Sequence, residues 1–463
     1  MVASAGTTFL RIIIGALTVL IAVSIKNYRD LGAPGKRPDL DNNEYWGAQL
    51  KQPYKENKAV LPFDISVDPA LIADLKAQLA RPLKLQTPLE GVGFEYGFNA
   101  KELEKVVNYW RDNYLSKWSQ REDFLKQLKH YQTEIQGLKI HFIHAKPSKA
   151  EGKKVLPLLL MHGWPGTVRE FYDFIPLLTQ GSDKSDYVFE VIAPSLPGYG
   201  WSQGASRPGF GVAQLAVVMR NLMLRVGFNK FLVQGGDWGS LIGSNVASLY
   251  PENVLGYHSN MCTNNSPMGQ LKLVLASLFP SFYVDKEYAH FYKGMGHLFA
   301  HIMEEMGYAH IQASKPDTIG SALAHNPVGL AAYILEKFST WTNAEYKYLA
   351  DGGLTKHFSY DQLLDNIMIY YVTNSITTSA RLYAESMSKA QMALNVDSLP
   401  IKAPAGCARF RNELMHAPDA VLANKFPYLV HSSHYEVGGH FPAFEVPQQL
   451  YDDFILYVNK TFV

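Results

Sequence analysis

The turn at residues 235–239, Gly-Gly-Asp-Trp-Gly, constrains this chain most, because it follows the apolar run 231–233 and precedes a helical pattern. Small residues flank its centre, which is typical of a strained strand-to-helix turn where a flanking Cβ would clash with the backbone. Such a turn presents its central side chain at the end of a strand. The central residue is Asp237, so we expect a carboxylate where enzymes with this turn usually carry a serine hydroxyl.

Asp237 directs the expected chemistry away from ordinary ester cleavage. A carboxylate is already ionised at neutral pH, whereas a serine hydroxyl needs a neighbouring base before it can attack. The aspartate can therefore attack a saturated carbon directly, and a histidine is then free to activate the water that hydrolyses the resulting ester. The pattern predicts displacement at carbon, with a halide or a strained epoxide as target, although a short G-x-D-x-G match is by itself also common in glycine-rich loops.

Short apolar runs and helical patterns alternate through the middle of the chain. The expected strands lie at 138–143, 155–161, 189–193, 231–233 and 254–258, and the expected helices at 212–226 and 241–250. This rhythm predicts an α/β fold with a mostly parallel sheet and helices on both faces. Reactive groups then belong at the carboxyl ends of the strands, where His162, Pro194 and Asp237 fall.

The strand rhythm stops after Asn264 and returns in the strands 408–410 and 428–430 and a last helix at 447–459. The intervening stretch has helical patterns and predicts a helical cap inserted over the sheet. We expect five parts: an N-terminal membrane anchor (1–26), a wrapping segment without chemistry of its own (27–150), the first part of the core (151–263), the cap (264–397) and the second part of the core (398–463).

Residues 9–25 are apolar apart from Arg11 and some small residues, and they would span about 25 Å as a helix. Lys26, Arg29, Lys36 and Arg37 follow the run. This charge asymmetry favours a retained anchor, with the rest of the chain in the cytoplasm, over a cleaved signal peptide.

The amino-acid composition limits the kinds of molecule that this protein is expected to bind. A net charge of +1 and the absence of a basic stripe or charge block argue against nucleic-acid binding. The two cysteines, Cys262 and Cys407, offer no disulfide framework, and so few cysteines fit a reducing compartment. No cluster of cysteines and histidines has metal-ligand spacing, so no metal or organic cofactor is expected.

The chain order nucleophile, acid, histidine is that of the α/β-hydrolase fold. His440, in the loop Gly-Gly-His-Phe before the last helix, is the expected base, and Glu413 after the preceding strand is the expected acid. The competing residues are His416, His431 and His434 for the base, and Asp419 and Glu436 for the acid. The loop 162–166, His-Gly-Trp-Pro-Gly, fits an oxyanion hole in which the backbone N–H groups of Trp164 and Trp238 bind the anionic oxygen, although alone it fits a plain β-turn.

These motifs, together with the cap stretches 307–318 and 335–342, resemble the microsomal epoxide hydrolase family, and within it the insect juvenile hormone epoxide hydrolases. The resemblance runs from about Tyr45 to the C-terminus and includes the apolar N-terminus. It implies an endoplasmic reticulum membrane location, a cis bond between Trp164 and Pro165, and Tyr308 and Tyr383 as the two groups that polarise the epoxide oxygen. The sequence alone does not choose among its 27 tyrosines.

The leading hypothesis is thus an epoxide hydrolase that forms a diol from a lipophilic epoxide and water. A haloalkane dehalogenase would share the aspartate turn and use the Trp238 indole for halide, leaving the cap tyrosines without a role. A third hypothesis is an inactive hydrolase fold that binds a lipophilic ligand.

Overall fold

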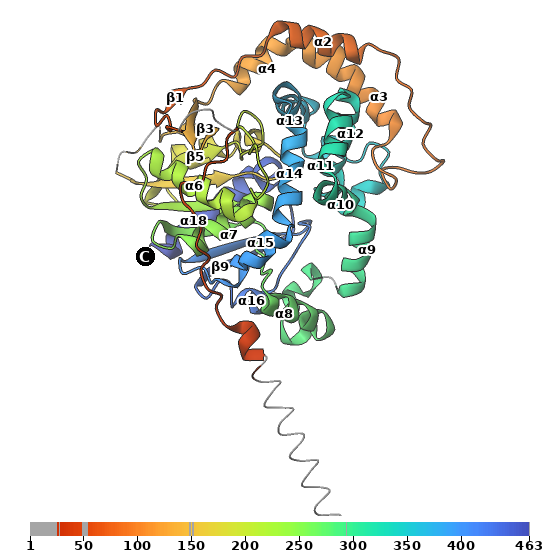
Figure 1. Cartoon of the computed structure of the whole chain (residues 1–463). Coiled ribbons are helices and arrows are strands. Elements are labelled where there is room, and N and C mark those ends of the chain that lie inside the picture. The colour runs from red at the N-terminus through yellow and green to blue at the C-terminus, as the bar shows by residue number, and fades with distance from the viewer. Residues whose placement is uncertain are drawn as a thin grey trace, which may run out of the picture.

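The computed structural model describes residues 26, 28–48, 54–147, 150, 152–292 and 294–462. Over these residues a nine-stranded sheet runs in the order β1-β2-β3-β5-β4-β6-β7-β8-β9 (Figure 1). Strands β4 to β9 are parallel to their neighbours, whereas β1 to β3 pair antiparallel and β3 joins β5 antiparallel. The strands are β1 (Leu61–Pro62), β2 (His130–Ile135), β3 (Leu138–Ala145), β4 (Lys154–Met161), β5 (Tyr187–Pro194), β6 (Phe231–Gly235), β7 (Val254–Ser259), β8 (Ala405–Phe410) and β9 (Leu429–Tyr435). The predicted mostly parallel α/β sheet is confirmed.

Side chains that alternate along each strand reach two separate hydrophobic cores. In β4, Leu158 and Leu160 join the core that holds α5 and α18, whereas Leu159 and Met161 join the core that holds α6 and α7. The sheet is therefore covered on both faces, as its parallel strands require. These covering helices are α5 (Ile175–Gln180), α6 (Val212–Arg225), α7 (Asp237–Leu249) and α18 (Pro447–Thr461).

The cap is a set of helices between β7 and β8 that lies beside the sheet (Figure 1). Side chains from α10, α12 and α14 enter the same hydrophobic core as α6 and α7, so the cap and one face of the sheet share a single apolar interior. The cap helices are α8 (Pro267–Leu278), α9 (Met295–Glu305), α10 (Gly307–Ser314), α11 (Pro316–Ala324), α12 (Pro327–Thr340), α13 (Tyr360–Thr373), α14 (Ile376–Ser386) and α15 (Lys389–Leu394).

The segment before β4 covers part of the cap and also extends the sheet. Its helices α2 (Pro69–Leu79), α3 (Ala100–Tyr109) and α4 (Trp118–Leu125) arch over α12 and α13, and β1 to β3 extend the sheet (Figure 1). The turn between β2 and β3 has Gln136 and Gly137 at positive φ, which gives the tight hairpin that brings β2 against β3. β2 was not among the expected strands, so the wrapping segment contributes more of the sheet than we expected.

A buried ion cluster joins this segment to the cap. The Asp365 carboxylate on α13 accepts hydrogen bonds from Arg121 at 2.5 Å and from Arg169 at 2.9 Å, and Tyr114 adds a third at 2.9 Å. Asp365 and Arg169 are almost completely buried. Three parts of the chain that are distant in sequence therefore share one carboxylate.

Asp365→Ala should lower the free energy of unfolding by about 3–5 kcal/mol, because it removes the buried charge partner of Arg169 and leaves that guanidinium only the half-exposed Asp173 at 3.5 Å. Urea unfolding of the variant would measure the loss. Asp361→Ala is the matched control on the same helix, since its carboxylate is one-third exposed and lies 3.9 Å from Arg121. The control should cost less than about 1 kcal/mol, and equal losses in the two variants would contradict the role of the buried cluster.

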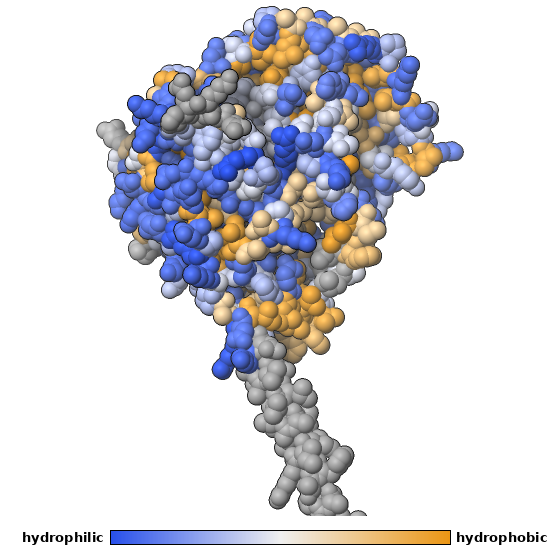
Figure 2. Space-filling view, in the orientation of Figure 1, coloured by the Kyte–Doolittle hydropathy of each residue, from blue (hydrophilic) through white to orange (hydrophobic). Residues whose placement is uncertain are grey.

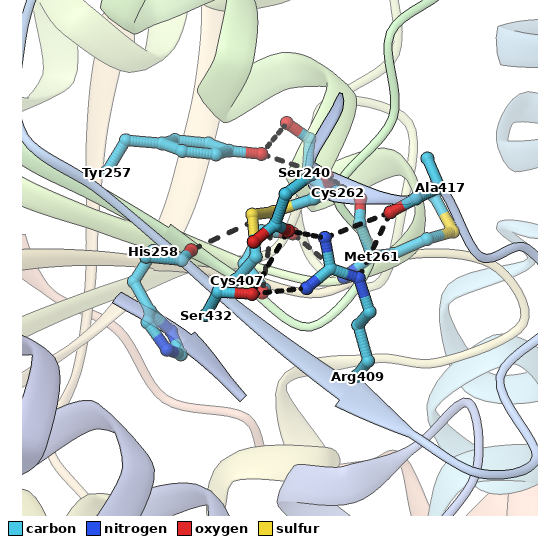
Figure 3. Close-up of a disulfide and its surroundings, with 12 residues drawn as sticks. Ser240, Tyr257, His258, Met261, Cys262, Cys407, Arg409, Ala417 and Ser432 are labelled. Atoms are coloured by element: carbon cyan, nitrogen blue, oxygen red, sulfur yellow. Dashed lines mark hydrogen bonds and ion pairs between the residues drawn. A yellow bond between two sulfur atoms is a disulfide. The ribbon is translucent and has the colours of Figure 1, made fainter. Parts of the chain in front are cut away.

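Cys262 and Cys407 form a disulfide, with their Cα atoms 5.9 Å apart (Figure 3). The expectation that these cysteines offer no disulfide framework was wrong, and their bond removes the support that they gave to a reducing compartment. They are separated by 145 residues in the sequence, which hid the pairing. The fold brings them together because β7 and β8 are neighbouring parallel strands, with Ser259 in register with Cys407, and the whole cap is inserted between them.

The expected membrane anchor at residues 1–26 lies almost entirely outside the described residues. Within the part of the chain that the structure describes, no helix has the length and apolar character needed to cross a bilayer.

Candidate active site

The turn at 235–239 has the expected strand-to-helix geometry, from the end of β6 into α7. Asp237 has a φ of 46°, in the left-handed region that few non-glycine residues adopt. Glycines make this conformation possible: a Cβ on Gly235 would lie 2.6 Å from the backbone of Gly239, and one on Gly239 would lie 2.2 Å from the Met161 carbonyl oxygen. The carboxylate is thereby presented at the carboxyl end of the parallel strands.

The predicted base and acid lie beside the Asp237 carboxylate. His440 Nδ1 is 2.5 Å from Glu413 Oε1, and His440 Nε2 is 3.5 Å from Asp237 Oδ2. Glu413 follows β8 and His440 follows β9, so adjacent strands bring them together. The His440 backbone N–H donates to the Trp341 carbonyl at 3.0 Å, which fixes the loop against the cap. The structure therefore assembles Asp237, His440 and Glu413 into one row.

The charges around His440 favour its protonated form. Burial alone would lower the pKa of this imidazole, but the Glu413 carboxylate and the Asp237 carboxylate raise the pKa well above its usual range. In the free protein His440 is therefore an imidazolium held between two carboxylates. Any reaction that neutralises Asp237 removes one of these charges, lowers the pKa of His440 and so favours the neutral imidazole that can accept a proton.

The loop after β4 faces Asp237 with a backbone donor. The Trp164 N–H donates to Asp237 Oδ1 at 2.7 Å, and the bond between Trp164 and Pro165 is cis, as expected. Helix α13 holds this loop, because Asn366 donates to the Pro165 carbonyl at 2.8 Å and Tyr370 to the Gly166 carbonyl at 3.0 Å. Trp238 is the second residue of α7 and lies in its first turn, where backbone N–H groups have no partner within the helix.

The two predicted tyrosines converge from different cap helices. Tyr308 on α10 stacks on Trp164 with ring centroids 5.0 Å apart, and Tyr383 on α14 meets Trp238 edge-on at 4.8 Å. Their own rings are 5.9 Å apart. Burial, with smaller contributions from neighbouring charges such as Asp237, raises the pKa of both phenols well above the usual range. Both hydroxyls therefore stay protonated and can donate hydrogen bonds at neutral pH.

The competing residues of the sequence analysis have partners elsewhere. His431 bonds the buried Asp453 at 2.8 Å, His434 bonds Tyr292 at 2.9 Å, and Asp419 pairs with Arg409 at 2.6 Å. His416 bonds the Phe410 carbonyl at 2.8 Å, and Glu436 pairs with His290 at 2.6 Å.

Two further carboxyl groups lie near His440 and were not among the expected site residues. Glu445 accepts the backbone N–H groups of Gly439 and Phe441 at 2.9 and 2.8 Å and so holds the loop on both sides of His440. Glu170 lies in the turn after the Trp164 loop and lines the same small cavity as Asp237 and His440. No motif marks either residue, because their roles depend on loops that only the folded chain brings together. Over the described residues no group of three His, Cys, Asp or Glu side chains could hold a metal ion.

The sheet, the strained turn and the Asp-His-Glu row together define an α/β-hydrolase with an aspartate in the place of the serine. Family comparisons agree: residues 157–391 match the family described as alpha/beta hydrolase fold, and residues 60–171 match the one described as Epoxide hydrolase N terminus.

Relatives that match most of the chain identify its family more closely. The chain is 48% identical to juvenile hormone epoxide hydrolase 1 of Ctenocephalides felis, covering 92% of this chain and 90% of the relative. It is 42% identical to epoxide hydrolase 1 of Oryctolagus cuniculus, over 90% and 92% of the two chains. Its fold superposes on the crystal structure of juvenile hormone epoxide hydrolase from the silkworm Bombyx mori with a TM-score of 0.88 and 44% identity, covering 91% of this chain and 99% of the other. The chain therefore belongs to the epoxide hydrolase family.

Proposed function

We propose that this protein converts a lipophilic epoxide, such as juvenile hormone or a related terpenoid epoxide, and water to a diol through a covalent ester on Asp237. The observation that carries the proposal is the Asp237 carboxylate, which lies beside His440 while two buried cap tyrosines pack on its neighbours Trp164 and Trp238. The names of the insect relatives support the substrate class.

In the first step Asp237 attacks one epoxide carbon and the carbon–oxygen bond of the ring breaks. Tyr308 and Tyr383 donate hydrogen bonds to the ring oxygen, which carries the developing negative charge. Their phenols are suited to this role because burial keeps them protonated. The opened ring oxygen takes a proton from one of the two phenols, and that phenolate regains a proton from the solvent. The product of the step is a hydroxyalkyl ester on an uncharged Asp237.

In the second step His440 takes a proton from water, and the water oxygen attacks the ester carbonyl carbon of Asp237. Esterification has removed one of the carboxylates that hold the proton on His440, so the imidazole can act as a base once it has lost that proton. The backbone N–H groups of Trp164 and Trp238 stabilise the anionic oxygen of the intermediate. Glu413 orients the imidazole, and no metal or organic cofactor takes part.

Incubation with a terpenoid epoxide and, separately, with a chloroalkane tests the activity. Diol from the epoxide without chloride from the chloroalkane is the expected result. Chloride release without diol would instead indicate a haloalkane dehalogenase, and neither product would indicate a binding protein. A comparison of kcat/KM over a panel of epoxides would then test the preference for terpenoid substrates.

Tyr308→Phe should slow formation of the ester by roughly 100-fold, because one of the two hydrogen-bond donors to the epoxide oxygen is lost while the ring stays packed on Trp164. Stopped-flow measurement of the first turnover would detect the change. Tyr333→Phe is the matched control, since that ring also contacts Trp164 and its hydroxyl makes no hydrogen bond within the described structure. A control as slow as Tyr308→Phe would contradict the assigned role.

We also propose that residues 9–25 anchor the protein in the endoplasmic reticulum membrane, with the catalytic part in the cytoplasm. Where the described chain begins, Gly32 lies against Met268 of α8. The same end of the molecule carries an apolar surface on α8, α9 and the turn between them (Figure 2). Its exposed side chains are Leu278, Phe279, Phe282, Phe299, Ile302 and Met303. Such a patch beside Gly32, which follows the proposed anchor in the sequence, is suited to contact with a bilayer in which lipophilic epoxides dissolve.

Membrane fractions of cells that express the full chain test this location. The protein should stay in the pellet after alkaline carbonate extraction, and protease added outside intact microsomes should digest the catalytic part. Release of the protein by carbonate, or its protection from protease, would contradict the proposal.

A further inference from the structure

A small cavity lies beside the nucleophile and has room for one water molecule. Its volume is about 20 Å³, close to what a single water requires. The polar groups that face it include Asp237, His440 and Glu170. Within the described part of the chain, His440 Nε2 is buried and makes no hydrogen bond. A water in this cavity would therefore find a base and the carbonyl carbon of the ester on adjacent walls.

Glu170 contributes a carboxyl group that the two-step mechanism has not used. It belongs to the short 3-10 turn Val168–Phe171 that follows the Trp164 loop, and its side chain folds back over Gly166. A Cβ on Gly166 would lie 1.3 Å from Glu170 Oε1, so glycine leaves the space that this carboxyl occupies. The neighbouring Arg169 does not neutralise the Glu170 carboxyl, because its guanidinium donates to Asp365 and Asp173 instead.

The surroundings keep this carboxyl uncharged at neutral pH. Burial raises the pKa of Glu170 to about 8; the positive charge of His440 opposes the rise, and the Asp237 carboxylate adds to it. The Glu445 carboxyl, whose own pKa burial also raises to about 8, adds to it once it ionises. A neutral carboxyl retains a carbonyl oxygen that accepts a hydrogen bond. A carboxylate at the same place would hold the proton on His440 and oppose its action as a base. An isolated buried acid costs stability, and such groups concentrate at functional sites.

We propose that Glu170 binds and orients the water that hydrolyses the Asp237 ester, an inference that rests on the proposed covalent mechanism. One O–H of the water donates to His440 Nε2 and the other to the carbonyl oxygen of neutral Glu170, so that a lone pair points at Cγ of Asp237. The new bond forms between the water oxygen and Cγ while the proton moves to Nε2. The bond from Cγ to the alkyl oxygen then breaks, that oxygen takes the proton from His440, and the diol leaves. The proton that remains on the Asp237 carboxyl passes to His440, which restores the carboxylate and the imidazolium.

The two chemical steps can be measured separately in variants of Glu170 within the full chain. Glu170→Leu should form the ester at the native rate and hydrolyse it about 100-fold more slowly, so that ester accumulates and is visible as a mass increase of the intact protein. Glu170→Gln keeps a neutral carbonyl oxygen of the same size and should hydrolyse the ester within about 3-fold of the native rate. The hydrolysis rate of the native protein should fall above pH 8 as Glu170 ionises, and this fall should be absent in Glu170→Gln.

Asp173→Asn is the matched control, because it makes the same acid-to-amide change three residues away on a half-exposed side chain outside the cavity. Both of its chemical steps should match those of the native protein. Native hydrolysis in Glu170→Leu, an equal slowing of both steps together with a lower melting temperature, or a Glu170→Gln variant as slow as Glu170→Leu would each overturn the proposal. If the native protein and His440→Gln form no ester at all, the covalent mechanism itself fails, whatever the Glu170 variants do.

Discussion

Asp237→Ala should abolish diol formation, with a loss of at least about 10,000-fold in kcat, because the variant lacks the carboxylate that forms the bond to carbon. Alanine tolerates the φ of 46° at this position poorly, so the variant should also lose some stability. Asp237→Asn separates the two effects, since asparagine adopts the left-handed region readily but its amide is a poor nucleophile. It should keep the native melting temperature while its first turnover is lost.

A single turnover in heavy-oxygen water gives an independent check on Asp237. The water attacks the ester carbonyl carbon, so the label should enter the Asp237 carboxylate and the first product molecule should carry none. Label that appears directly in the first diol would mean that water attacks the epoxide itself. A native rate in Asp237→Ala would lead to the same conclusion.

His440→Gln should trap the ester. The first step needs only an ionised Asp237 and the two tyrosines, whereas the second needs a base at the Nε2 position. We expect steady-state turnover to fall by roughly 1,000-fold or more, and the intact protein to gain the mass of one substrate molecule. Mass spectrometry of the intact protein after mixing with excess epoxide would measure this gain in mass.

Glu413→Gln is an informative companion to that experiment. It keeps an oxygen 2.5 Å from Nδ1 but removes the charge that helps to keep the proton on His440, so turnover should fall less than in His440→Gln. If His440→Gln kept full multiple-turnover activity, the base would have to be sought elsewhere.

The positions of Asp237, His440 and Glu413 could be predicted because the chain carries local signals for them. Glycines at 235, 236 and 239 mark the turn, and the other two residues directly follow apolar strand patterns. The two cap tyrosines carry no such local signal. Nothing local separates Tyr308 and Tyr383 from the other helical tyrosines, since only the packing of α10 against α14 brings them together; their selection required the family resemblance.

The features that sequence reasoning missed all depend on contacts between distant segments. Cys262 and Cys407 meet because β7 and β8 are neighbours across the cap insertion, and β2 is stabilised by pairing with β3 more than by its own alternation of apolar residues. Glu170 is an ordinary acidic residue in the sequence, and only the fold of the loop over Gly166 shows that it is buried beside His440.

The bond between Cys262 and Cys407 encloses the complete cap, because every helix from α8 to α15 lies between the two cysteines. Both roots of the cap are therefore fastened to each other as well as to the sheet. Any opening of the cap must therefore keep its two ends together, with the Cα atoms of the two cysteines about 5.9 Å apart. One peptide bond cut inside the cap would leave two fragments that stay joined until the disulfide is reduced.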